Sequence, residues 1–229
     1  MSKAVVVAMD GPSGSGKSST SRGVADRLGL RYLDTGAQFR AITLWMLRHD
    51  VDVHDPAAVA AHAGAPALHS GTDPLDPSIS LDGEDVAEAI RSAAVTAAVS
   101  PVATVPEVRT RLLAMQREII TEALAHAGIV VEGRDIGSVV WPEADVKLYL
   151  TADPAARAAR RTHENGSGSV AETEAALIRR DQIDSSRAAA PLTVPEGAVH
   201  LDTTPYDLAE VIAKVVEIVA GSVSTKATP

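Results

Sequence analysis

The sequence predicts an α/β fold in which a five-stranded parallel sheet is covered by helices on both faces. Short apolar, β-branched runs alternate with stretches of helical character, and a glycine-rich turn joins the first run to the first helical stretch. With 229 residues, of which 45% are hydrophobic, the chain is long enough to bury such a sheet. We therefore expect a single domain over residues 1–229 with a small insert.

The apolar runs and the segments between them define the expected elements of the core. Expected strands are residues 4–9, 31–33, 129–132, 146–150 and 199–201. Expected helices are residues 17–28, 37–49, 106–125, 154–162, 171–188 and 206–219. A proline marks the start of two of them, at Pro106 and Pro154. The core is thus expected to comprise residues 4–56, 104–162 and 171–219.

Three segments depart from this alternation. Residues 57–103 are expected to form a small β-rich insert, because Asp82-Gly83 between short extended runs is typical of a hairpin. Helices at residues 57–62 and 86–100 are expected to flank it. The Gly/Ser-rich residues 163–170 suit a mobile lid over about residues 157–172, and equally a flexible surface loop. Residues 221–229 are expected to be disordered.

The bulk composition excludes several classes of function. A net charge of −9 argues against a broad nucleic-acid or membrane surface. The absence of cysteine excludes disulfides, thiolate catalysis and cysteine-ligated zinc. No apolar run approaches the length of a membrane span. We expect a cytoplasmic monomer with no nucleic-acid or membrane partner.

The turn after the first strand matches a phosphate-binding loop. Residues 11–18 read Gly-Pro-Ser-Gly-Ser-Gly-Lys-Ser, which fits G-x-x-x-x-G-K-[ST]. In such a loop, backbone N–H groups surround phosphate oxygens and the next helix directs its positive end at them. We expect Lys17 to reach the β- and γ-phosphates and the Ser18 hydroxyl to take part in binding Mg²⁺. The expected ATP-binding residues are Gly11, Pro12, Ser13, Gly14, Ser15, Gly16, Lys17, Ser18 and Ser19.

Arginines cluster where loops leave the strands at the same edge of the sheet. In an acidic protein, cationic forks at that edge predict several bound phosphates, although each alone could be a surface ion pair. One anion site for a donor and one for an acceptor indicate phosphoryl transfer rather than hydrolysis. The sequence lacks an Asn-Lys-x-Asp element for reading guanine. The arginines concerned are Arg40, Arg134, Arg157, Arg160, Arg161, Arg179, Arg180 and Arg187.

Four motifs together resemble the bacterial cytidylate kinases, a family of P-loop nucleoside monophosphate kinases. They are residues 10–18, residues 34–40 (Asp-Thr-Gly-Ala-Gln-Phe-Arg), residues 132–137 (Glu-Gly-Arg-Asp-Ile-Gly), and residues 184–188 (Asp-Ser-Ser-Arg-Ala) followed by Pro191-Leu192. Residues 83–91 are similar to the family's enlarged substrate-binding insert. The resemblance covers about residues 4–219. It implies a P-loop kinase core, a nucleoside-monophosphate-binding insert and a short lid.

The resemblance also implies an activity and residue roles. The γ-phosphoryl group of ATP would be transferred to CMP or dCMP, with Mg²⁺, in pyrimidine nucleotide metabolism. Ser100, Arg109 and Asp135 would contact cytosine, and Asp184 with Arg180 would hold the ribose. The implied substrate-binding residues are Thr35, Arg40, Ser100, Arg109, Arg134, Asp135, Arg180, Asp184 and Arg187. The implied catalytic residues are Lys17, Arg134, Arg157, Arg160 and Arg161.

The chain departs from the family pattern, and two other functions stay open. Gln38-Phe39 replaces an apolar-Tyr pair, so a phenolic hydroxyl is lost near the acceptor. Thr35 stands where many relatives have Ser, and Trp141 where Phe is usual. One alternative is a kinase of another small acceptor, such as UMP, AMP or shikimate, although the insert and the Gly-Arg-Asp element argue against a minimal small-molecule kinase. The other is a nucleotide-dependent switch with slow hydrolysis, which has no use for a second anion site.

Overall fold

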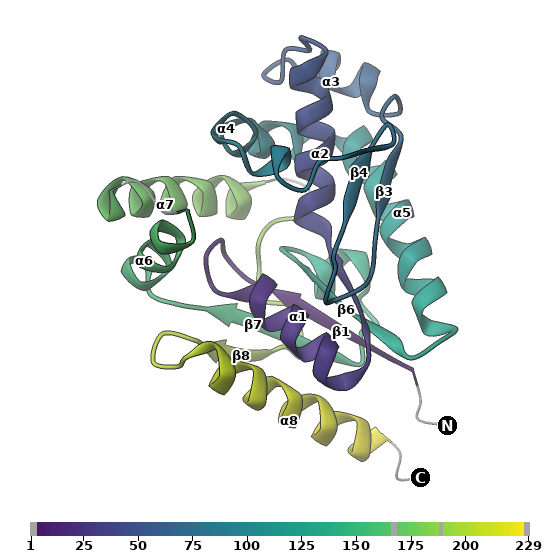
Figure 1. Cartoon of the computed structure of the whole chain (residues 1–229), viewed down its shortest axis with the longest axis vertical. Coiled ribbons are helices and arrows are strands. Elements are labelled where there is room, and N and C mark those ends of the chain that lie inside the picture. Colours follow the sequence, from purple (N-terminus) through teal and green to yellow (C-terminus); the bar gives the residue numbers. More distant parts are fainter. Residues whose placement is uncertain (1–3, 166–168, 188–189, 227–229) are drawn as a thin grey trace.

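A computed structural model describes residues 4–165, 169–187 and 190–226 and contains the expected five-stranded parallel sheet (Figure 1). The spatial order is β2-β6-β1-β7-β8, and each neighbouring pair runs parallel. The strands are β1 (Val5–Asp10), β2 (Arg31–Asp34), β6 (Gly128–Gly133), β7 (Val146–Thr151) and β8 (Val199–Asp202). All five expected strands, and with them the fold class, are confirmed.

Helices cover both faces of the sheet. On one face, α1 (Lys17–Leu28) and α8 (Leu208–Lys226) pack against a cluster that includes Val5, Val7 and Met9. On the other face, α5 (Pro106–Leu124) packs against Val6 and Ala8. Because β1 is buried on both faces, its sequence is apolar at every position before Asp10 and does not alternate.

The insert has a hydrophobic core of its own, built around α2 (Thr35–Arg48). Figure 1 shows α2 rising from the sheet into the insert, with β3 and β4 running back toward α1. The expected hairpin is confirmed, since Asp82 and Gly83 both have positive φ, at 52° and 85°. The remaining elements are α3 (Pro56–His62), β3 (Leu68–Ser70), β4 (Ile79–Leu81), β5 (Glu84–Asp85), η1 (Ala89–Arg91) and α4 (Ala93–Val102).

Three expectations about helices were wrong. The expected helix over residues 86–100 starts only at Ala93, because the Ser92 side chain caps that turn by accepting from the Val95 N–H. The irregular stretch 163–170 is shorter, since α6 (Pro154–Asn165) and α7 (Val170–Ser186) enter it from both sides; residues 166–168 lie outside the described residues. The tail, expected to be disordered over residues 221–229, is helical as far as Lys226, because α8 continues past Val219; residues 227–229 lie outside the described residues.

Smaller differences concern where helices begin. α2 starts at Thr35, directly after β2, because the Asp34 carboxylate accepts from the Ala37 N–H. A short π-helix, η2 (Ile136–Val140), follows β6 and was not expected. Within the residues described, no helix combines the length and the apolar character that crossing a membrane requires.

Candidate active site

The phosphate loop begins at the carboxyl end of β1 and is held in place by backbone packing. Gly11 has φ of 144°, and a Cβ there would lie 2.0 Å from the Leu150 carbonyl oxygen. The buried Asp10 carboxylate accepts from the N–H groups of Ile136 and Gly137 at 2.7 and 2.8 Å. Burial raises the pKa of Asp10 to about 6. The end of β1 is thereby fastened to η2, which fixes where the loop starts.

A cavity of about 530 Å³ opens beside the loop, between the sheet edge, α2 and the insert. Many predicted site residues line it, which supports the expectation that the phosphate donor and the phosphate acceptor bind next to each other. They are Ser13, Gly14, Gly16, Lys17, Ser18, Ser19, Arg40, Arg134, Arg161 and Arg180. Residues that the sequence analysis did not select also line it, among them Arg22, Asp34, Ser70, Ser78, Arg91 and Glu132.

Positive charge is crowded into this cavity. Burial, and next the neighbouring Arg134, lowers the pKa of Lys17. Burial, and next Arg161, lowers the pKa of Arg40 to about 10. For Arg180, burial and next Arg134 lower the pKa to about 9. These cations repel one another, so an anion placed among them would be stabilised.

Glu132 is the main residue that the sequence analysis missed. Its side chain is 3% exposed, and it accepts hydrogen bonds from the Ser18 hydroxyl at 3.0 Å and from the Tyr32 hydroxyl. Burial, and next Asp34, raises the pKa of this carboxyl. The sequence feature that could have identified Glu132 was its position near the carboxyl end of β6, the strand that lies beside β1. A hydroxyl and a carboxylate at a phosphate loop form an oxygen ligand set that suits Mg²⁺ bound to nucleotide phosphates.

Arg109 and Asp135 form a second, largely buried group next to the cavity. Their side chains make an ion pair and are 13% and 8% exposed. Arg109 also donates to the Ala103 carbonyl at 3.2 Å and lies over the Phe39 ring, 5.5 Å from its centroid. Burial raises the pKa of Asp135, although Arg109 opposes the shift. Ser100 is buried on α4.

Arg134 connects the cavity to α7. Its Nε donates to the Asp184 carboxylate at 3.1 Å, and Arg187 Nη1 lies 3.9 Å from the other Asp184 oxygen. Among the described residues, Arg187 Nη2 and Arg180 Nε are buried without a hydrogen-bond partner. Buried donors of this kind are the groups that a bound ligand could satisfy.

Several predicted site residues donate hydrogen bonds within the protein, and Arg157 and Arg160 thereby hold the loop. Arg157 is 5% exposed and donates to the carbonyls of Ser13 and Ala152 at 3.0 and 3.1 Å. Arg160 donates to Thr203, whose hydroxyl in turn donates to the Ser15 carbonyl at 3.1 Å. Lys17 Nζ donates to the Pro12 carbonyl at 2.7 Å. The Thr35 hydroxyl donates to the Glu132 carbonyl at 2.7 Å.

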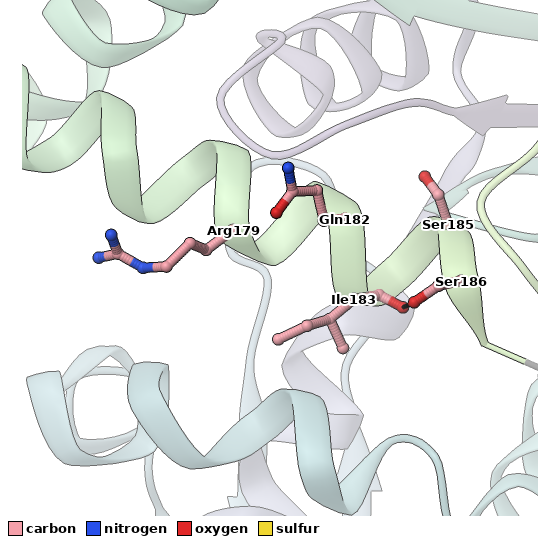
Figure 2. Close-up of a pocket in the computed structure, with 5 residues that line it drawn as sticks. All are labelled: Arg179, Gln182, Ile183, Ser185 and Ser186. Carbon is pink, nitrogen blue, oxygen red and sulfur yellow. Dashed lines mark hydrogen bonds between the residues drawn. The ribbon is translucent and has the colours of Figure 1, made fainter.

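A second cavity, of about 680 Å³, lies along α7 and has a different character (Figure 2). Its lining side chains are Arg179, Gln182, Ile183, Ser185 and Ser186, all from this one helix. Ligand sites are usually enclosed by several elements with convergent polar groups. The cavity at the phosphate loop meets that description, and we take it as the candidate active site.

Together, a phosphate loop on a parallel sheet and an insert across a cationic cavity define a P-loop kinase. The cytidylate kinase family model matches residues 7–221. A cytidylate kinase of Streptomyces avermitilis is 56% identical, covering 94% of this chain and 93% of that protein. A cytidylate kinase of Nocardia farcinica is 52% identical, covering 96% of each chain. This chain belongs to the cytidylate kinase family.

The fold itself also occurs among solved structures of low sequence identity. An uncharacterized protein from Eubacterium ventriosum is 9% identical and superimposes with a TM-score of 0.52, covering 96% of this chain and 99% of that chain. At this identity the comparison shows the fold alone.

Proposed function

We propose that the reaction of this family, transfer of the γ-phosphoryl group of ATP to CMP or dCMP, takes place in the cavity beside the phosphate loop. As a member of the family, the chain is an ATP-dependent nucleoside monophosphate kinase. One observation carries the placement of the reaction: Lys17, Arg40, Arg134, Arg161 and Arg180 all line the same cavity. The phosphates of two bound nucleotides would carry enough negative charge to offset the repulsion among these cations.

At the donor end, the loop would bind the ATP phosphates through its backbone N–H groups and Lys17. Ser18 and Glu132 would hold Mg²⁺, directly or through its water shell, and the ion would neutralise charge on the β- and γ-phosphates. The hydrogen bond between Ser18 and Glu132 keeps these two oxygen groups together before a ligand arrives.

At the acceptor end, Arg40, Arg134 and Arg187 would grip the phosphate of CMP. Asp135, held by Arg109, would accept a hydrogen bond from the N4 amino group of cytosine. Uracil carries a carbonyl at that position, which the carboxylate would repel. The Asp184 carboxylate, supported by Arg180, would accept hydrogen bonds from the ribose hydroxyls.

Catalysis of this kind depends on position and charge. Arg161 would stabilise the transferring phosphoryl group from the lid side of the cavity, while Arg157 and Arg160 would support that side through the loop. We further propose that the enzyme works as a cytoplasmic monomer on free nucleotides, since its acidic net charge of −9 disfavours nucleic acid.

The test is ADP formation from Mg²⁺-ATP with CMP, dCMP, UMP, AMP, GMP, shikimate or no acceptor. We expect strong stimulation by CMP and dCMP only, and a loss of at least about 100-fold in kcat for Lys17→Ala. Stimulation by a different acceptor would overturn the assignment of cytosine recognition to Asp135 and Arg109. Slow turnover that ignores every acceptor would favour a nucleotide-dependent switch.

A further inference from the structure

Two glutamines lie in the core where apolar side chains would be expected. Gln38 on α2 is 0% exposed, and Gln116 on α5 is 2% exposed. Gln116 occupies the same buried stripe of its helix as Leu112 and Ile120. A buried amide is costly unless its polar atoms are hydrogen-bonded, so a pair of them calls for a specific arrangement of partners.

The two amides form a hydrogen-bond relay that ends at the cavity. Gln116 Nε2 donates to Gln38 Oε1 at 3.0 Å, and Gln38 Nε2 donates to Ser70 Oγ at 3.0 Å. Ser70 is the last residue of β3 and lines the cavity. Since its oxygen accepts from Gln38, the hydroxyl hydrogen of Ser70 is directed to a different acceptor.

The wall around Ser70 is suited to an anion. Arg40 and Arg91 line the same cavity. Ser78 lines it too, and its backbone carbonyl accepts a hydrogen bond at 2.9 Å from the N–H of Gly71, the residue that follows Ser70. Arg109 and Asp135, the pair assigned to the base, are not among the residues that line this cavity within the described chain. The natural ligand of the Ser70 hydroxyl is therefore a phosphate oxygen rather than the base.

We propose that Ser70 binds the phosphate of the acceptor nucleotide by donating its hydroxyl hydrogen, and that Gln38 and Gln116 orient it. This inference rests on the proposed function. It also explains why Gln38, which departs from the apolar residue of the family pattern, can stand at a fully buried position. Gln38 and Gln116 are positioning residues, whereas Ser70 touches substrate.

Ser70→Ala tests the contact. We expect the KM for CMP to rise about tenfold, equivalent to about 1.4 kcal/mol, with the KM for ATP changed less than twofold. Calorimetry should show weaker CMP binding and unchanged binding of cytidine, which lacks the phosphate. Ser70→Thr should restore CMP binding. Ser80→Ala is the matched control, because Ser80 lies in the same small sheet but does not line the cavity.

A double-mutant cycle separates positioning from simple support of the fold. Gln38→Met alone should raise the KM for CMP about threefold, and it should add nothing in a Ser70→Ala background. An unchanged KM in Ser70→Ala, or an equal loss of cytidine binding, would overturn the phosphate contact. A further loss from Gln38→Met in the double variant would overturn the relay. Absence of CMP-dependent turnover in the wild-type enzyme would instead overturn the proposed function, and the inference with it.

Discussion

Replacement of Arg157 tests whether this residue supports the phosphate loop or acts on the transferring phosphoryl group. In the structure its guanidinium is committed to the protein: it bonds the carbonyls of Ser13 and Ala152 and pairs with the Asp181 carboxylate at 2.5 Å. Asp181 in turn lies 3.4 Å from the Ser13 N–H, with which it forms a hydrogen bond. Arg157 therefore connects α6, the loop and α7, and its removal should loosen all three.

The expected magnitude follows from what Arg157→Ala leaves behind. Breaking one side of a buried ion pair costs about 3–5 kcal/mol, and the lower part of that range applies because Asp181 keeps 18% of its side chain exposed. For a chain of this size, each kcal/mol lowers the melting temperature by about 2–4 °C. We expect the melting temperature of Arg157→Ala to fall by about 10 °C.

The assay pairs thermal unfolding with kinetics, and Arg161→Ala is the matched control. Arg161 lines the cavity and is less buried than Arg157, so its removal should lower kcat for phosphoryl transfer at least about tenfold and should lower the melting temperature less than Arg157→Ala does. For Arg157→Ala we expect the opposite pattern, in which the main effects are a large fall in melting temperature and a raised KM for ATP. A melting temperature within about 2 °C of the wild type, together with a large loss of kcat, would refute the supporting role of Arg157.

Three further perturbations have defined outcomes. Asp135→Asn should reduce the preference for CMP over UMP, measured as the ratio of kcat/KM values, at least about tenfold while the KM for ATP stays within twofold; an unchanged ratio would exclude base reading by this carboxylate. Gly11→Ala should lower stability by about 3 kcal/mol or more in urea unfolding, because its Cβ would lie 2.0 Å from a carbonyl oxygen; near-wild-type stability would show that β7 can move away. Burial raises the pKa of Asp10 to about 6, so the contribution of this carboxyl to stability is full below pH 4 and is lost as pH rises through 6. Asp10→Asn should therefore flatten the pH dependence of the free energy of unfolding between pH 4 and 7. An equally steep or steeper dependence in the variant would contradict the stabilising role of the protonated carboxyl.

The sequence predicted those features of the fold that are encoded locally. The run that forms β1 is apolar at every position before Asp10 because it is buried on both faces, and this pattern alone predicts a central parallel strand. The phosphate loop is equally local, since its glycines and Lys17 follow one another in the chain. The start of α4 was misjudged because an apolar segment permits helix anywhere, whereas the Ser92 cap selects one first turn.

The partners of the site residues could not be predicted in the same way. Glu132 accepts hydrogen bonds from the hydroxyls of Tyr32 and Ser18, which lie on other elements and far away in the chain. The engagement of Arg157 with Asp181 depends on how α6 and α7 pack, and no periodicity in either helix signals it. Composition and spacing indicated which arginines gather at the sheet edge, but their division into loop supports and cavity cations required the packing of the chain.

The arginines at this edge of the sheet fall into two groups: some hold the phosphate loop, and others line the cavity. Arg157 and Arg160 donate to carbonyls, a hydroxyl and a carboxylate of the protein, and in this arrangement they hold the loop. Burial, and next the neighbouring arginines, lowers the pKa values of Arg40 and Arg180, so the protein keeps them charged at an electrostatic cost. In the proposed reaction, the phosphates of ATP and CMP would bring negative charge next to these cations and would offset that cost.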